Sequence, residues 1–249
     1  MRNPRFVLPV TFALALVPAF VACGGGGDDG GDDDGATIDA PPAAQMLTVT
    51  GQAQTVSGTS TVPLEGAMIQ AFRNGSDATP IGMATSDSQG NYSIALTTDG
   101  TAIDGYLKGT SATRLDTYLY PPKPLTADRA NATMLLVTQQ TLGLLGTLGG
   151  TSQMATKGFI GVRIVDANGA GVPGVTVTIN PMGTAKIIYA VNNLPNQNAT
   201  MTDSSATVFI ANTETGTIRV DASGGGVDYY EHDVNARAGV ITTTAMEPK

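Results

Sequence analysis

The sequence is poor in the residue types on which most enzyme and metal sites depend. Its 249 residues include one cysteine, one histidine and no tryptophan. A single cysteine excludes an internal disulfide, so any hydrophobic core must be held together by burial alone. A single histidine, His232, leaves a peptidase-type zinc site without its usual set of ligands. We therefore predict no catalytic residues, no metal site and no cofactor.

Basic residues are also scarce. The chain has 13 lysines and arginines against 21 aspartates and glutamates, which gives a net charge of −8. Binding to nucleic acid depends on neutralising phosphates with basic side chains, so we predict no nucleic-acid partner. The lack of tryptophan counts modestly against carbohydrate binding. The low charge and the abundance of Gly, Thr, Ala and Val are typical of an extracellular β-protein.

Residues 1–22 have the three parts of a secretory signal peptide. Arg2 and Arg5 supply the positive start, Phe6–Ala19 forms the apolar run, and the small residue Ala22 precedes the expected cut. The apolar run is shorter than the roughly 20 residues that a membrane span needs, so a permanent transmembrane helix is the weaker interpretation. We predict that the protein is exported.

The end of this segment, Phe20-Val21-Ala22-Cys23, resembles the lipobox of bacterial lipoproteins. The resemblance implies that Cys23 becomes the acylated N-terminus and carries several fatty chains, which together anchor a protein stably. In that family the absence of Asp after the cysteine, where Gly24 stands here, favours the outer membrane. The alternative is ordinary cleavage near Ala22 and a free thiol.

Residues 23–45 are rich in glycine, contain no basic residue and show no apolar periodicity. Such a segment cannot bury enough surface to offset the entropy of ordering, so we predict a disordered acidic tether. The spacing of its acidic residues is not that of a calcium-binding loop, which favours a solvated spacer. The aspartates are Asp28, Asp29, Asp32, Asp33, Asp34 and Asp39.

Residues 46–138 and 158–249 each consist of short, alternating, β-branched segments with turns about every 8–12 residues, a pattern typical of a β-sandwich. The order of segments repeats: Val172–Ile179 matches Val62–Ile69, while Thr200–Asp203 and Ala206–Ile210 match the third and fourth strands of the first unit. We therefore predict an all-β fold of two tandem Ig-like sandwiches. Ala132–Thr138 is predicted as the last strand of the first.

Thr85–Tyr92 in the first unit and Val165–Val177 in the second resemble the carboxypeptidase regulatory-like domain. That family is a transthyretin-like, seven-stranded β-sandwich common in bacterial surface proteins. The matched residues belong to turns and cores, so the resemblance implies a fold and carries almost no chemistry. The second unit departs from the pattern at Ser204-Ser205-Ala206, where the family has a turn glycine.

Residues 139–157 lie between the two units. Leu142, Leu144, Leu145 and Leu148 form one helical face. We predict a short connecting helix followed by a linker, which would hold the sandwiches at a preferred angle. A membrane role is the weaker alternative, because the segment has about half the length of a span.

Two tyrosine pairs are the candidate ligand contacts. Tyr118 and Tyr120 precede a proline-rich segment, and Tyr229 and Tyr230 follow three glycines. Exposed rings could bind a cell-surface glycan, peptide or protein. The alternative, which we favour, is that each pair packs at the rim of its sandwich, the first on an edge strand ended by prolines.

These observations predict a non-enzymatic lipoprotein at the cell surface that acts as an interaction or spacer module. The alternative function is an accessory domain of a secreted hydrolase system, or a minor hydrolase. A Ser-His-Asp site would have to use His232, and no Gly-x-Ser-x-Gly turn precedes a helix.

Overall fold

β-Strands are the main elements of the part of the chain that the structure describes, as alternation of apolar and polar residues predicts. The computed structural model describes residues 44–57, 60–76 and 78–249. The predicted signal peptide, Cys23 and all but the last two residues of the predicted tether lie outside the described residues. Seventeen strands and one helix have these bounds: β1 Met46–Ser57, β2 Ser60–Pro63, β3 Met68–Arg73, β4 Gly82–Thr85, β5 Asn91–Thr97, β6 Gly105–Thr110, β7 Thr117–Tyr120, β8 Met134–Leu135, α1 Gln139–Leu148, β9 Gly158–Ile164, β10 Val175–Asn180, β11 Lys186–Val191, β12 Leu194–Asn196, β13 Thr207–Thr213, β14 Gly216–Gly224, β15 Val227–Asp228, β16 His232–Ala236 and β17 Ile241–Met246.

The predicted all-β fold with a short helix is confirmed, and its strands pair in the same way in the N-terminal half (residues 44–138) and the C-terminal half (residues 158–249). In the N-terminal half β1 pairs antiparallel with β5 and parallel with β8. In the C-terminal half β9 pairs antiparallel with β13 and parallel with β17. The central strands also correspond, because β6 joins β3 to β7 just as β14 joins β10 to β16.

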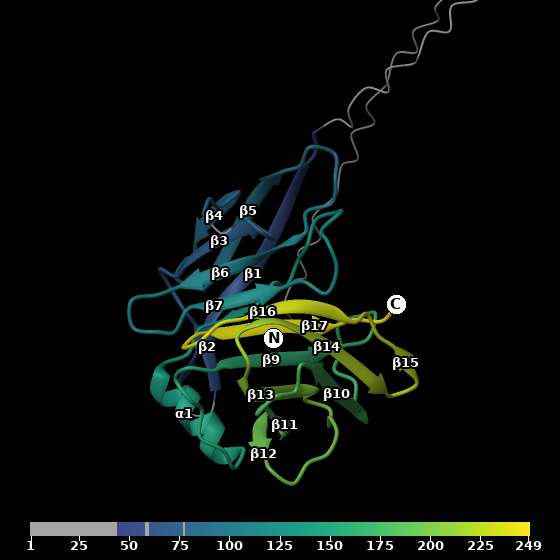
Figure 1. Cartoon of the computed structure of the whole chain (residues 1–249). Helices are drawn as coiled ribbons and strands as arrows, with labels where there is room; N and C mark the ends of the chain where they lie inside the picture. The colour runs from purple at the N-terminus through teal and green to yellow at the C-terminus, as the bar shows by residue number, and fades with distance from the viewer. Residues whose placement is uncertain (1–43, 58–59, 77) are drawn as a thin grey trace, which may run out of the picture. The chain divides into compact units, whose positions relative to one another are not determined.

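One nine-stranded sheet runs through both halves, in the order β12-β11-β13-β9-β17-β7-β6-β3-β4. The C-terminal strand β17 makes this connection, since it pairs in parallel with β9 on one side and with β7 on the other (Figure 1). The halves are therefore joined by main-chain hydrogen bonds as well as by α1. That each half is a domain in its own right stays a prediction.

Two smaller sheets complete the layers. β2-β1-β5 with β8 covers the N-terminal half, and β10-β14-β15 with β16 covers the C-terminal half. Consecutive residues of a strand point to opposite faces, so the shared sheet contributes to both cores. On β6, Leu107 belongs to the N-terminal core and the preceding Tyr106 to the C-terminal core. Ala71 and Phe72 of β3 divide in the same way.

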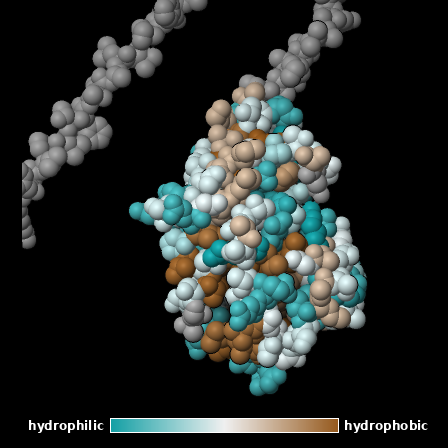
Figure 2. All heavy atoms as spheres, turned by 90° about the vertical axis from the view of Figure 1, so that its left-hand side faces the viewer, coloured by the Kyte–Doolittle hydropathy of each residue, from teal (hydrophilic) through white to brown (hydrophobic). Residues whose placement is uncertain are grey.

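The helix α1 lies where the leucine spacing predicts it. Thr138 caps its start by accepting a hydrogen bond from the Thr141 amide at 3.1 Å, which satisfies one of the free amides of the first turn. Leu142 is buried in a small cluster with Phe159 and Ile188. Leu144 and Leu148 are exposed, and Figure 2, which views the side on which α1 lies, shows apolar atoms gathered in patches among hydrophilic ones.

Each half has a corner, at which one buried side-chain hydroxyl, that of Ser86 or Thr202, forms two hydrogen bonds to the main chain. The Ser86 hydroxyl accepts a hydrogen bond from the Ala67 amide (2.9 Å) and donates to the Leu64 carbonyl (2.6 Å). The Thr202 hydroxyl accepts from the Val175 amide (2.9 Å) and donates to the Val172 carbonyl (2.8 Å). The repeat seen in the sequence is therefore also a repeat of local structure.

This corner corrects the register of the predicted repeat. Gly66 and Gly174 both adopt the left-handed conformation, with φ of 73° and 75°, and both donate their amide to the carbonyl of the capping residue, Ser86 or Thr202. Gly174 is thus equivalent to Gly66, so the match of Val172–Ile179 with Val62–Ile69 is wrong by two residues. Val62-Pro63 and Val172-Pro173, at the start of the two matched segments, therefore do not occupy equivalent positions.

Two predicted strands are also corrected. Thr200–Asp203 is not a strand, because Thr202 and Asp203 are held in the corner and its turn. Only Met134–Leu135 of the predicted strand Ala132–Thr138 pairs with β1. The preceding residues follow β1 through single hydrogen bonds, including Ala132 to the Thr50 carbonyl at 3.0 Å.

Candidate binding site

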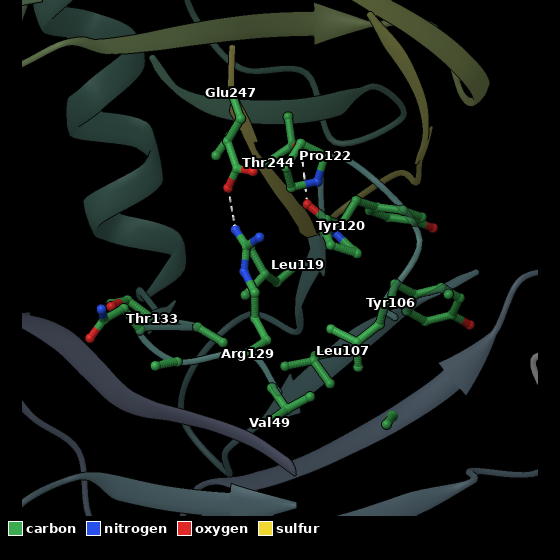
Figure 3. A pocket seen from close by; sticks show the side chains of 18 of the residues that line it. Val49, Tyr106, Leu107, Leu119, Tyr120, Pro122, Arg129, Thr133, Thr244 and Glu247 are labelled. Carbon is green, nitrogen blue, oxygen red and sulfur yellow. Dashed lines mark hydrogen bonds and ion pairs between the residues drawn. The ribbon is translucent and has the colours of Figure 1, made fainter. Parts of the chain in front are cut away.

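A pocket of about 670 Å³ opens between the two layers of the N-terminal half. Its volume lies within the range of typical small-molecule sites, about 300–1,000 Å³. One wall is formed by β1 and β5, the other by β3, β6 and β7, and the C-terminal strand β17 closes one end (Figure 3). The aliphatic side chains of the walls include Val49, Ala71, Ile81, Leu96, Ile103, Leu107, Leu119 and Leu125, and the lining residues also include Phe72, Tyr106 and Tyr120.

The pocket exists because the N-terminal strands direct their aromatic rings away from it. Figure 3 shows Val49, Leu107 and Leu119 pointing inward, while the rings of Tyr106 and Tyr120 point away. These two rings, with Phe72, belong to the C-terminal core on the other face of the sheet. The N-terminal core keeps only one aromatic residue, Tyr92. Small and aliphatic side chains thus face the interior of the N-terminal half and leave space between its layers.

Three charged residues line the pocket, Arg129, Arg163 and Glu247. The Arg129 guanidinium donates a hydrogen bond to Glu247, and the Lys123 amine lies 4.0 Å from the other oxygen of that carboxylate. Arg163 forms no ion pair among the described residues. The lining therefore combines apolar walls with a charged group of net charge +1.

The main chain of Arg129 is fixed on β1. Its amide donates to the Thr48 carbonyl at 2.9 Å, and its carbonyl accepts from the Thr50 amide at 2.8 Å. Its side chain is one third exposed and the Glu247 side chain 18% exposed. The guanidinium is thus held between the apolar interior and solvent.

The first tyrosine pair lies on an interior strand. β7 is flanked by β6 and β17, so the interpretation of an edge strand is wrong. Tyr120 is 4% exposed, and its hydroxyl accepts a hydrogen bond from Arg237 at 3.0 Å. Tyr118 is partly buried and has the same guanidinium 4.1 Å from its ring centre. Both rings pack with Tyr106 in one aromatic cluster.

The second tyrosine pair is divided between core and surface. Tyr229 is 1% exposed and belongs to the C-terminal core, so its ring is not available to a ligand in this structure. Tyr230 is 36% exposed, and the Lys123 amine lies 5.7 Å from its ring centre. The amide of Tyr230 donates to the Glu247 carbonyl at 3.0 Å. Tyr230 is therefore a neighbour of the charged group but does not line the pocket.

His232 is partly buried between β14 and β17. Its Nε2 bonds the Thr244 hydroxyl, which donates in turn to the Tyr120 carbonyl at 3.0 Å. Because this hydroxyl donates to Tyr120, we assign Nε2 as the donor to Thr244. Burial lowers the pKa of His232. No serine, aspartate or histidine lines the pocket, and His232 meets the lining only through its hydrogen bond to the Thr244 hydroxyl.

Sequence reasoning missed the residues of the pocket. Arg129 and Glu247 are 118 positions apart, and neither belongs to a recognisable motif. Among the described residues, no group of three His, Cys, Asp or Glu side chains could hold a metal ion. No helix within the described ranges is long and apolar enough to span a membrane.

No protein-family model matches the sequence, and no curated protein matches it. Among solved structures, the chain is similar to the minor pilin of Streptococcus agalactiae, at 14% identity and a TM-score of 0.27 over 82% of this chain and 96% of that one. It is also similar to the shaft pilin SpaA of Lactobacillus rhamnosus GG, at 13% identity and a TM-score of 0.26 over 82% and 98% of the two chains. The TIE protein of Bacillus anthracis matches at 11% identity and a TM-score of 0.26 over 82% and 34%. Values this low assign neither a family nor a function.

Proposed function

We propose that this protein is an exported, lipid-anchored, non-enzymatic module of the cell surface that binds a small ligand with an apolar part. The observation that carries the proposal is the pocket of about 670 Å³ between the layers of the N-terminal half. Burying apolar ligand surface in such a space contributes about 25 cal/mol per Å². The walls are mainly apolar, which favours binding over bond breaking.

The anchor is a separate part of this proposal. The lipobox-like sequence before Cys23 and the acidic, glycine-rich segment after it support acylation at Cys23 and a body held away from the outer membrane. The repeated Asp turns of the body support the resemblance to carboxypeptidase regulatory-like domains. Cys23→Ser should move the protein from the detergent-extracted membrane fraction to the soluble fraction. A wild-type protein without acyl mass would contradict the anchor and leave the pocket proposal intact.

The binding function is tested with a neutral apolar dye, Nile red, whose fluorescence rises in an apolar site. Leu119→Trp fills the pocket from β7 and should weaken dye binding at least tenfold. Leu194→Trp is the matched control, because Leu194 is 51% exposed on β12 and does not line the pocket. Equal binding by the two variants, with unfolding temperatures like that of the wild type, would contradict the proposal.

Should Leu119→Trp unfold the body, Leu125→Trp tests the same space from another position. Leu125 is partly exposed where it lines the pocket, so the larger ring is more easily accommodated. The same loss of dye binding is expected, since both substitutions remove the same volume.

A further inference from the structure

We infer that the ligand of this pocket is an anionic amphiphile, a carboxylate carried on an aliphatic chain. The inference rests on the proposed function and adds the chemical class of the ligand. The chain would lie against Leu107, Leu119 and the other aliphatic walls, and the carboxylate would bind the Arg129 guanidinium. The aliphatic chain of such a ligand matches the apolar walls, and its carboxylate matches the charged residues of the lining.

The charge of the lining favours an anion. Two of its three charged residues are arginines, and Lys123 adds a third cation close to Glu247. Arginine is the side chain best suited to a carboxylate, because its planar fork can donate two parallel hydrogen bonds. A cationic head group would instead lie beside Arg129 and Arg163 and would have Glu247 as its only partner in the lining.

The structure already holds a carboxylate on Arg129. Glu247 accepts a hydrogen bond from the guanidinium, which shows that this guanidinium can meet a carboxylate at the pocket. Glu247 is anchored independently of that contact, since its main-chain carbonyl accepts from Tyr230. Its side chain can therefore swing away while the main chain stays in place. Glu247 acts as an internal competitor that a ligand carboxylate displaces.

Competition predicts opposite effects for the two partners of the ion pair. Arg129→Gln removes the group that binds the ligand, and should weaken binding about tenfold or more, the equivalent of one charged hydrogen bond. Glu247→Gln removes the competitor, and should tighten binding severalfold. A purely structural role for the pair predicts that both substitutions weaken binding, because both break the same contact.

The test uses three probes with the same ten-carbon chain: decanoate, 1-decanol and decyltrimethylammonium. Titration calorimetry on the wild type should rank decanoate tightest. Arg129→Gln should bring decanoate close to decanol, and Glu247→Gln should widen the gap between them. Arg219→Gln is the control, because Arg219 forms an exposed ion pair with Asp233 and does not line the pocket.

The outcomes separate the two proposals. If none of the probes binds, the binding function fails and the ligand class with it. If decanol or decyltrimethylammonium binds as tightly as decanoate, the pocket is a binding site and the anionic class is overturned. The anionic class is also overturned if Glu247→Gln weakens decanoate binding. An unfolding temperature for each variant keeps loss of fold apart from loss of ligand.

Discussion

The two halves of the body use the same corner and turn but fill their interiors differently. Each half has a buried hydroxyl that ties two strands together, Ser86 in one and Thr202 in the other. The C-terminal core contains five aromatic residues, Phe72, Tyr106, Tyr120, Tyr189 and Tyr229, whereas the N-terminal core contains Tyr92 alone. Three of the five come from strands of the N-terminal half. The repeat thus fixes the architecture, and the direction of a few large rings leaves space for the pocket in the N-terminal half.

The turn after each corner shows how far the repeat extends. In the N-terminal half Asp87 accepts from the amides of Gln89 and Asn91, and Gly90 has a φ of 77°. In the C-terminal half Asp203 accepts from the Ser205 amide, and Ala206 occupies the glycine position with a φ of 51°. The missing turn glycine is therefore a change of residue within a retained conformation. An alanine in the left-handed region costs about 1–2 kcal/mol.

The largest expected effect comes from making the two turns alike. In Gly90→Ala the new methyl group would lie 2.4 Å from the Ala53 carbonyl oxygen, in addition to the left-handed strain. We expect a loss of about 3 kcal/mol in the free energy of unfolding. Ala206→Gly should change stability by less than about 1 kcal/mol, because relief of strain offsets the loss of a buried methyl worth about 0.8 kcal/mol. Urea denaturation measures the free energy of unfolding of both variants. If the two variants lost equal stability, the turn positions of Gly90 and Ala206 would not be equivalent.

The next effect tests the equivalence of the two corners. Ser86→Ala leaves the Ala67 amide and the Leu64 carbonyl without their partner, and should cost about 2 kcal/mol. Thr202→Val should cost about the same amount, because it removes the same two bonds while keeping the volume of the side chain. Ser223→Ala, at an exposed hydroxyl, is the control and should stay within about 0.5 kcal/mol. A loss at only one corner would show that the halves do not rely on this feature equally.

The difference in packing predicts opposite responses to added volume. Ile218 is 0% exposed in the C-terminal core, so Ile218→Phe should overpack it and cost about 1–2 kcal/mol. Leu119 lines the pocket, so the larger ring of Leu119→Phe has space to enter and should leave stability unchanged or raise it slightly. Thermal unfolding distinguishes the two. A comparable loss from Leu119→Phe would mean that the pocket closes in solution.

Local signals in the sequence predicted local structure well. The spacing of Leu142, Leu144, Leu145 and Leu148 predicted α1, although Leu144 and Leu148 are exposed and do not pack on one buried face with the other two. In the second unit the carboxylate of Asp166 accepts from two amides in a local turn. The shared sheet could not be predicted, because the pairing of β17 with β7 and β9 depends on contacts more than 70 residues apart that no local pattern records. For the same reason alternation showed that Tyr120 and Leu119 point to opposite faces, but not which core lies behind each face. The pocket depends on which core lies behind each face, so it could not be predicted from the sequence.

The smallest effect is a dependence of stability on pH that belongs to the C-terminal half. Burial lowers the pKa of His232 below its usual value near 6.5, while a main-chain hydrogen bond with Tyr230 and the charges of Asp233 and Glu247 favour the charged form and oppose the shift in part. The unfolded chain therefore binds a proton at a higher pH than the folded chain, and stability must fall as the pH drops below about 6.5, down to the folded pKa. His232→Gln keeps a donor for Thr244 but cannot be protonated, so the pH profile of its unfolding temperature should be flatter below about pH 6.5. The carboxylates of both halves remain in the variant as an internal control. A profile parallel to that of the wild type would show that His232 is protonated equally in the folded and unfolded chains.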